Sequence, residues 1–177
     1  MSPGSNGTEL ATERLQLRMF RPEDFAVHAE ICADPEVMRY IRAGPIAPEE
    51  AWWQIARYLG HWRLRGYGMW AVVEKATAEL IGHIGFLNPE GGHGFELGWA
   101  LARRAWGRGY ALEGTRAAVR HAFTALDRDH ILCLIRPENA RSIRLAERLG
   151  AALEREIEIS GQRLAVYGIR RPATGAT

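Results

Sequence analysis

Residues Arg104–Gly114 read RAWGRGYALEG, and Gly107 and Gly109 stand one residue apart between bulky and basic side chains. An apolar run precedes this stretch, and the periodicity of a helix begins near Gly109. A helix N-terminus offers unpaired backbone N–H groups and partial positive charge, and glycine lets a ligand approach them closely. The pattern predicts an anion-binding loop, most naturally for a pyrophosphate. Nearby arginines would add charge: Arg103, Arg104 and Arg108.

Two common phosphate-binding motifs do not fit this loop. Leu112 occupies the third glycine position of the dinucleotide fingerprint, and no repeat of short parallel strands surrounds it. The nucleotide P-loop requires a Gly-Lys-Ser/Thr sequence, which this stretch lacks. The glycines alone therefore leave the ligand open, and simple packing at a helix start could also account for them.

The remaining periodicities predict one mixed α/β (α+β) domain with a largely antiparallel sheet. The predicted strands are Leu15–Phe20, Met69–Val73, Leu80–Leu87, Phe95–Leu101, His130–Arg136, and a hairpin of Leu153–Ser160 and Arg163–Ile169 around Gly161. The predicted helices are two short ones within Arg21–Ile41 separated at Pro35, one opened by Pro48 with Trp52, Ile55, Leu59 and Trp62 in the core, one after Gly109, and one over Asn139–Leu149. The strand–helix–strand order predicts that Phe95–Leu101 and His130–Arg136 lie parallel.

Composition limits the class of protein. The 177 residues suit one domain, assigned to residues 12–171, with flexible tails over Met1–Ala11 and residues 172–177. No apolar run spans a membrane, and no secretory signal is visible. The net charge of +2 is too weak to predict nucleic-acid binding. Cys32 and Cys133 predict buried or idle thiols in a reducing, cytoplasmic setting, and the scattered histidines predict no metal site.

Four stretches together resemble a known family. ELGWALARRAWGRGYALEGTRA (Glu96–Ala117) and RPENARSIRLAERLGA (Arg136–Ala151) resemble the GNAT superfamily of N-acetyltransferases. TERLQLRMFRPEDF (Thr12–Phe25) and IGHIGF (Ile81–Phe86) are similar to its ribosomal-protein alanine N-acetyltransferase branch. The resemblance implies a GNAT-type acyl-CoA N-acyltransferase fold, with a mostly antiparallel sheet, one splayed parallel pair of strands and flanking helices.

The resemblance also implies acetyl-CoA as the acetyl donor. The family signature Gln/Arg-x-x-Gly-x-Gly/Ala fits two registers, and the branch's usual Trp-Gly-x-Gly-Tyr-Ala favours the one from Trp106 to Ala111. Backbone N–H groups of Gly107–Ala111 would hold the pyrophosphate, and the strand ending at Leu101 would bond the pantetheine arm as an added strand does. Asn139 matches the family's asparagine beside this arm, or is a plain helix cap. The implied donor-binding residues are Trp99, Ala100, Leu101, Trp106, Gly107, Arg108, Gly109, Tyr110, Ala111 and Asn139.

Acetyl transfer to an amine requires a base, a donor to the developing oxyanion, and a donor to the leaving thiolate. The resemblance implies Glu96 as the base, usually through water, although a solvated strand carboxylate is the alternative. The backbone N–H of Trp99 would polarise the carbonyl. Many relatives use a tyrosine at the thiol end, where this chain has Ala146. Ser142 matches a serine near the sulfur, or is an ordinary first-turn residue.

The acceptor is left open. Its site would comprise the early helices, the loop Arg42–Pro48 and the final hairpin, with Arg39, Tyr40 and Arg42 hinting at an anionic group and His83 on the acceptor face as a weaker base candidate. The predicted function is acetyl-CoA-dependent N-acetylation of a primary amine, on a protein N-terminus or a small molecule, by direct attack in a ternary complex. The alternative is a non-catalytic acyl-CoA sensor or regulatory protein with the same fold. The protein could be a monomer or homodimer.

Overall fold

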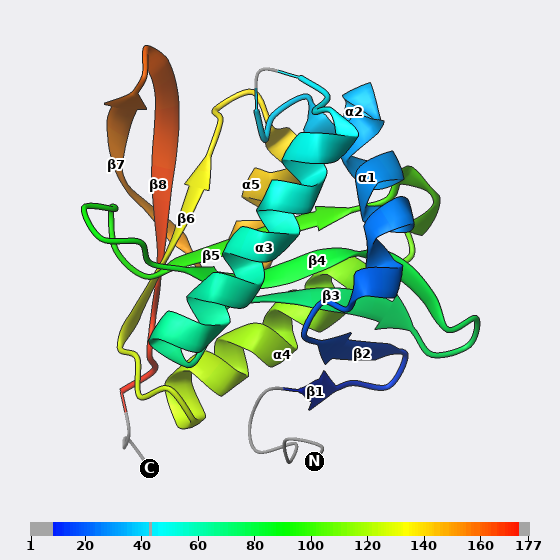
Figure 1. Ribbon diagram of the computed structural model, residues 1–177. Coiled ribbons are helices and arrows are strands. Elements are labelled where there is room, and N and C mark those ends of the chain that lie inside the picture. The colour runs from blue at the N-terminus through cyan, green and yellow to red at the C-terminus, as the bar shows by residue number, and fades with distance from the viewer. Residues whose placement is uncertain (1–8, 43, 174–177) are drawn as a thin grey trace.

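The computed structural model describes residues 9–42 and 44–173, whose strands form one sheet with helices on both faces (Figure 1). The strand order is β1-β2-β3-β4-β5-β6-β8-β7, and only β5 and β6 pair in parallel among these described strands. The strands are β1 Leu10–Ala11, β2 Leu15–Arg18, β3 Met69–Glu74, β4 Glu79–Leu87, β5 Glu96–Leu101, β6 His130–Ile135, β7 Ala152–Ile159 and β8 Gln162–Arg170. The predicted mixed α/β class with one parallel pair is confirmed.

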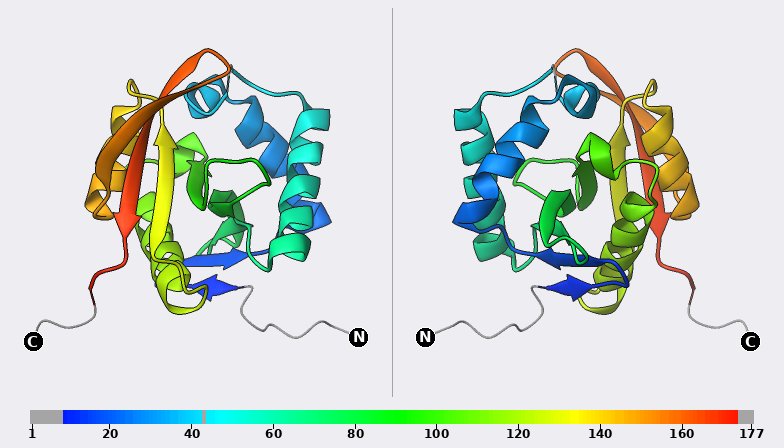
Figure 2. Two further views of the ribbon diagram at one scale, coloured as in Figure 1. Left: turned by 90° about the vertical axis from the view of Figure 1, so that its left-hand side faces the viewer. Right: turned by 90° about the vertical axis from the view of Figure 1, so that its right-hand side faces the viewer.

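The helices lie on opposite sides of the sheet, with α1 and α3 on one side and α4 and α5 on the other (Figure 2). Their bounds are η1 Pro22–Asp24, α1 Phe25–Ala33, α2 Pro35–Met38, α3 Pro48–Arg65, η2 Arg103–Ala105, α4 Tyr110–Thr124 and α5 Ala140–Arg148. Within the described residues, no helix is both long and apolar enough to cross a membrane.

Strand β3 is buried on both faces because the two helix layers cover it. Trp70 and Val72 belong to the cluster that includes Ala118 and Ala122 of α4. Met69, Ala71 and Val73 alternate with them and pack with Ile55 and Tyr58 of α3. This alternation fixes which face each sheet residue meets, and so which residues can reach a site.

Two predictions about the early part of the chain are wrong. Trp52 is 51% exposed and packs edge-on against Trp53, because the buried face of α3 follows Ala51, Ile55, Tyr58 and Trp62 instead. Leu10 and Ala11 are not part of a loose tail, since they form β1 and pair with β2. The outer parts of the predicted tails, residues 1–8 and 174–177, lie outside the described residues.

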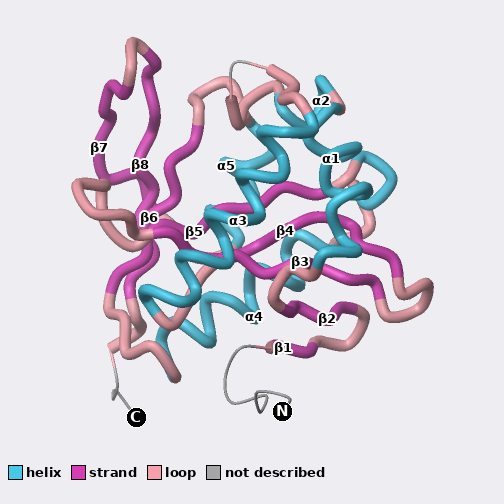
Figure 3. The backbone as a smooth tube through the Cα atoms, viewed as in Figure 1, coloured by secondary structure: helices cyan, strands magenta, loops and turns pink. Residues whose placement is uncertain are grey.

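Strands β5 and β6 pair at one point and then separate. Their register pair is Glu96 with Leu132, and the Leu132 N–H donates to the Phe95 carbonyl at 2.8 Å. Figure 3 shows β6 turning away from β5 beyond this point. The opening between them is the feature of the fold that positions the site.

Candidate active site

The edge of β5 that faces the opening has backbone groups without a strand partner. Along a strand, the backbone N–H and C=O groups of successive residues point to opposite edges. The Phe95 carbonyl points toward β6, so the backbone groups of Leu97, Trp99 and Leu101 point to the same edge. No register pair between β5 and β6 follows Glu96 in the described chain. The N–H and C=O of Trp99 therefore face the opening, while the Leu101 carbonyl accepts from Trp106 Nε1 at 2.8 Å.

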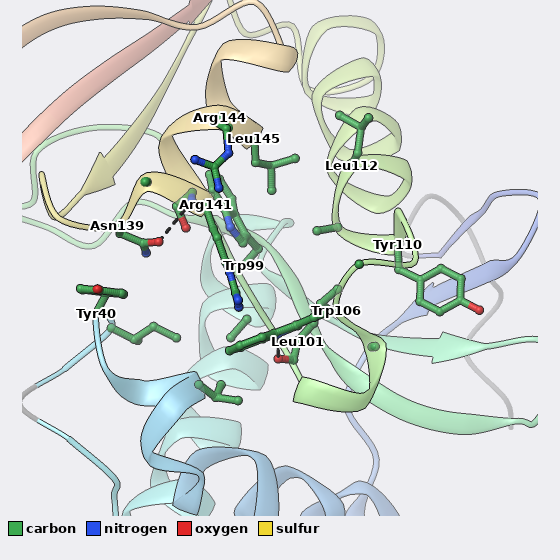
Figure 4. A pocket seen from close by; sticks show the side chains of 18 of the residues that line it. Tyr40, Trp99, Leu101, Trp106, Tyr110, Leu112, Asn139, Arg141, Arg144 and Leu145 are labelled. Atoms are coloured by element: carbon green, nitrogen blue, oxygen red, sulfur yellow. Dashed lines mark hydrogen bonds between the residues drawn. The ribbon is translucent and has the colours of Figure 1, made fainter.

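Two cavities meet at this opening. The first, here the loop cavity, has a volume of about 1030 Å³ and lies between α2, β5, residues 105–112 and α5 (Figure 4). The second, here the hairpin cavity, has a volume of about 960 Å³ and reaches the turn between β7 and β8. Residues that line both cavities are Tyr40, Ile41, Trp99, Asn139 and Ser142.

The glycines of the predicted anion loop adopt the left-handed conformation that favours glycine. Gly107 has φ +74° and Gly109 has φ +80°, and α4 begins directly after them at Tyr110. A Cβ placed on Gly107 would meet nothing within 4 Å, so close packing inside the protein does not explain this glycine. The loop thus brings the N-terminus of α4 to the wall of the loop cavity, with room for an anion.

The side chain of Tyr110 holds the loop from behind and does not enter the loop cavity. Its ring is buried and points away from the other labelled residues of Figure 4. The hydroxyl donates to Glu74, whose pKa is lowered by this bond and by contacts that include Arg108. The guanidinium carbons of Arg14 and Arg108 lie 4.5 and 4.8 Å from the ring centroid. Only backbone groups of Tyr110 can therefore contact a ligand in the loop.

The loop arginines that the sequence predicted to add charge each lie near a carboxylate of the protein. Arg103 pairs with Asp34 at 2.8 Å, Arg104 lies 3.5 Å from Glu79, and Arg108 pairs with Glu74 at 2.9 Å. None of the three lines the loop cavity. Each guanidinium thus has a carboxylate partner within the protein and is not aimed into the loop cavity.

Sequence reasoning missed the arginines that do line the loop cavity. Arg141, Arg144 and Arg148 stand at i, i+3 and i+7 of α5, which puts them on one face of the helix. None of them has an ion pair with a carboxylate in the described chain, and the Arg141 guanidinium carbon lies 4.5 Å from the Trp106 ring centroid. The helical spacing of the three arginines within ARSIRLAER could have predicted this positively charged face.

Glu96 lines the hairpin cavity, as the alternation along β5 predicts. Its neighbours Phe95 and Leu97 point into the core on the other face. Burial raises the pKa of the Glu96 carboxyl above its usual value, while a backbone hydrogen bond and the charge of His93 oppose this shift. The carboxyl is thus a better proton acceptor than a free glutamate would be.

His83 and Tyr58 also line the hairpin cavity, from β4 and α3. The Tyr58 hydroxyl lies 3.4 Å from His83 Nε2, and His83 Nδ1 has no hydrogen-bond partner among the described residues. Burial, aided by neighbouring His28, lowers the pKa of His83 to about 3. The imidazole is therefore neutral at physiological pH and a much weaker base than Glu96.

Asn139 and Ser142 lie where the two cavities meet. The Asn139 side-chain oxygen accepts from the Ser142 N–H at 3.2 Å, which confirms the predicted helix cap (Figure 4). Ala146 is fully buried one turn further along α5, so this position offers no hydroxyl to the opening.

The predicted acceptor residues divide between the two cavities. Arg39 lines the loop cavity and lies 3.9 Å from Glu36, whereas Arg42 lines the hairpin cavity and lies 3.9 Å from Glu50. Tyr40 lines both. Arg136, at the end of β6, also lines the hairpin cavity and was not predicted.

Comparison with known proteins gives consistent matches over nearly the whole domain. The family model described as acetyltransferase (GNAT) domain matches residues 14–152. The uncharacterized N-acetyltransferase p20 of Bacillus licheniformis is 33% identical over 143 residues, 79% of this chain and 80% of its own. The acetyltransferase of Agrobacterium tumefaciens str. C58 is 31% identical, with a TM-score of 0.83 over 92% of this chain and 94% of its own.

A more distant structure shares the fold alone. RimJ of Mycobacterium smegmatis, solved in complex with CoA-disulfide, is 19% identical, with a TM-score of 0.74 over 88% of this chain and 81% of its own. The family match covers the anion loop, the opening between β5 and β6 and all of α5. By this match, the chain belongs to the GNAT acetyltransferase family and is an acetyltransferase.

Proposed function

We propose that this enzyme transfers the acetyl group of acetyl-CoA to a primary amine by direct attack in a ternary complex. The observation that carries the proposal is that the loop and hairpin cavities meet at the unpaired edge of β5 beside Trp99. One cavity has the chemistry of an anionic donor site, and the other contains a half-buried carboxylate, Glu96. A donor and an acceptor could thus enter from opposite sides and react at the opening.

The loop cavity fits acetyl-CoA. Backbone N–H groups from Gly107 to Ala111 would hold the pyrophosphate at the N-terminus of α4. The exposed edge of β5 would accept the extended pantetheine arm as an added strand, which brings the thioester to Trp99. Arg141, Arg144 and Arg148 supply the positive charge that the loop arginines do not, since they lack carboxylate partners in the described chain.

The transfer step can be written with the residues of the opening. Glu96 takes a proton from the acceptor's ammonium group, directly or through water, and the freed nitrogen attacks the thioester carbon. The Trp99 N–H donates to the carbonyl oxygen as negative charge develops there. The carbon–sulfur bond breaks as the carbon–nitrogen bond forms, and Ser142 donates a hydrogen bond to the leaving thiolate. The attacking nitrogen loses its second proton to solvent, and the thiolate is protonated from solvent.

The acceptor is a primary amine of a protein N-terminus or of a small molecule. The sequence resemblance favours the ribosomal-protein branch, while the structural likeness to RimJ supports the fold alone. An α-amino group has a reference pKa near 8, so a half-buried glutamate with a raised pKa is a sufficient base for it. His83, Tyr40 and Arg42 line the hairpin cavity and would contact this acceptor.

The test is thiol release from acetyl-CoA with a panel of amines, namely peptides with free N-termini, polyamines, amino acids and aminoglycosides. Wild type and Glu96→Gln are assayed side by side, and acetyl-CoA binding to both is measured by calorimetry. We expect release with one acceptor class, a loss of at least a hundredfold in the variant from removal of the base, and unchanged donor binding. A fully active variant would remove Glu96 from the mechanism. Donor binding without release for any amine would favour the sensor function.

A further inference from the structure

Arg136 is a charged group of the hairpin cavity for which the described residues supply no counter-ion. Its Nη2 donates to the Arg42 carbonyl at 3.2 Å and to the Gln162 side-chain oxygen at 2.5 Å, and both acceptors are neutral. No ion pair joins Arg136 to a carboxylate anywhere in the described chain. A guanidinium carries five N–H donors, so these two bonds leave further donors for a ligand.

The other charges of the hairpin cavity have assigned partners. Arg42 lies 3.9 Å from Glu50. Glu96, in the proposed function, faces the ammonium group of the acceptor. Once these two pairs are counted, Arg136 is the remaining positive charge among the described residues that line the cavity. A ligand that brings one ammonium and one anionic group would leave every charge paired.

Arg136 also links two chain segments that line the hairpin cavity. Its two bonds join the segment after α2, at Arg42, to the start of β8, at Gln162. Figure 2 shows the tip of the β7–β8 hairpin reaching toward this segment at the same end of the sheet. A cavity bridged in this way favours a small acceptor over a folded polypeptide surface.

We propose, on the basis of the proposed function, that the acceptor is a small amine that also carries a carboxylate or phosphate, and that Arg136 binds this anionic group while the amine faces Glu96. Guanidinium forks match the planar geometry of carboxylates and the oxygens of phosphates. Arg136 would thus determine specificity by distinguishing the anionic amine from its neutral analogue.

The test measures product binding, so that it does not depend on turnover. The protein saturated with CoA is titrated calorimetrically with N-acetylated ω-amino acids of two to six carbons and, for each, the corresponding amide. N-acetylethanolamine phosphate and N-acetylethanolamine form a second pair that separates phosphate from carboxylate recognition. We expect at least one anionic compound to bind roughly tenfold to a hundredfold more tightly than its neutral partner, the range of a charged hydrogen bond.

Three variants test whether Arg136 is responsible. Arg136→Gln should abolish the preference for the anion, Arg136→Lys should keep part of it, and Arg163→Gln should keep all of it. Arg163 is the matched control because it lies next to Gln162 but is exposed and pairs with Glu156 at 3.8 Å. If Arg136 only held the hairpin in place, its loss would weaken acid and amide equally, and this outcome would overturn the proposal.

The two proposals fail in different ways. If no anionic compound binds more tightly than its neutral partner, the inference about Arg136 is wrong, whatever the thiol-release assay shows. An N-acetylated peptide amide is titrated in the same way. If it binds as tightly as the anionic compounds, a protein N-terminus is indicated as the acceptor instead. A clear preference for an anion in a protein that releases no thiol would keep Arg136 as an anion-binding residue, but would remove the proposed transferase reaction and with it the identification of this ligand as an acceptor.

Discussion

At the scale of single residues, Glu96 and His83 show how one cavity shifts the pKa values of two titratable groups in opposite directions. Burial raises the pKa of Glu96 and lowers that of His83 to about 3, because burial disfavours the charged form of each. A carboxylate becomes a stronger base in this way and an imidazole a weaker one. Residue type alone would favour His83 as the base, because histidine is the usual base near neutral pH.

The pH profile of kcat/KM tests this assignment. The proposed mechanism needs the ionised carboxylate of Glu96, so activity should be full above its raised pKa and fall as pH drops through it. The acidic limb should therefore lie above the value of about 4.3 for a free glutamate. Glu96→Gln should lose this limb and keep the pH dependence that comes from ionisation of the acceptor amine. An acidic limb at the same pH in the variant as in the wild type would assign that limb to another group.

Gly107 and Gly91 form a matched pair for testing the anion loop. They have φ values of +74° and +71°, and a Cβ on either would meet nothing within 4 Å. Alanine at either position should cost about 1 kcal/mol of folding stability from the left-handed conformation. Gly107→Ala alone should raise the KM for acetyl-CoA, roughly tenfold, because the methyl group enters the space for the pyrophosphate. Equal KM values for the two variants would place the pyrophosphate elsewhere.

At the scale of elements, α5 contributes the positive face of the loop cavity. Arg144→Gln combined with Arg148→Gln should raise the KM for acetyl-CoA roughly threefold to tenfold and leave kcat unchanged, since exposed charges contribute modestly. The KM of the double variant should also depend less on salt. Arg120→Gln, on the exposed face of α4, is the control. An unchanged KM and salt dependence in the double variant would exclude these arginines from donor binding.

The elements themselves were largely predictable, and the orientation of their charged side chains was not. Pro48, the Asn139 cap and the left-handed Gly109 give local boundaries that sequence patterns report well. Arg103, Arg104 and Arg108 lie next to the loop in sequence yet pair with carboxylates on other elements. Arg136 reaches Arg42 and Gln162 from far along the chain. Such partners depend on tertiary packing, which local patterns do not encode.

At the scale of the whole molecule, two layers of helices on one splayed sheet form two cavities that share Trp99, Asn139 and Ser142. This arrangement supports the proposal that donor and acceptor are bound together. A route through an acetylated enzyme would instead need a nucleophile of the protein at the opening. Cys32 and Cys133 are both buried, line neither cavity, and have pKa values raised by burial to about 11 and about 12. Neither thiol is ionised enough at neutral pH to attack a thioester.

Steady-state kinetics should therefore show sequential binding. Double-reciprocal plots with both substrates varied should intersect, because both must be bound before a product leaves. A covalent intermediate would give parallel lines instead. Intact mass measurement after incubation with acetyl-CoA alone should show no added acetyl group at Cys32 or Cys133. Parallel lines together with an acetylated protein would mean that a residue of this chain carries the acetyl group, and that the shared opening serves two half-reactions in turn rather than one direct transfer.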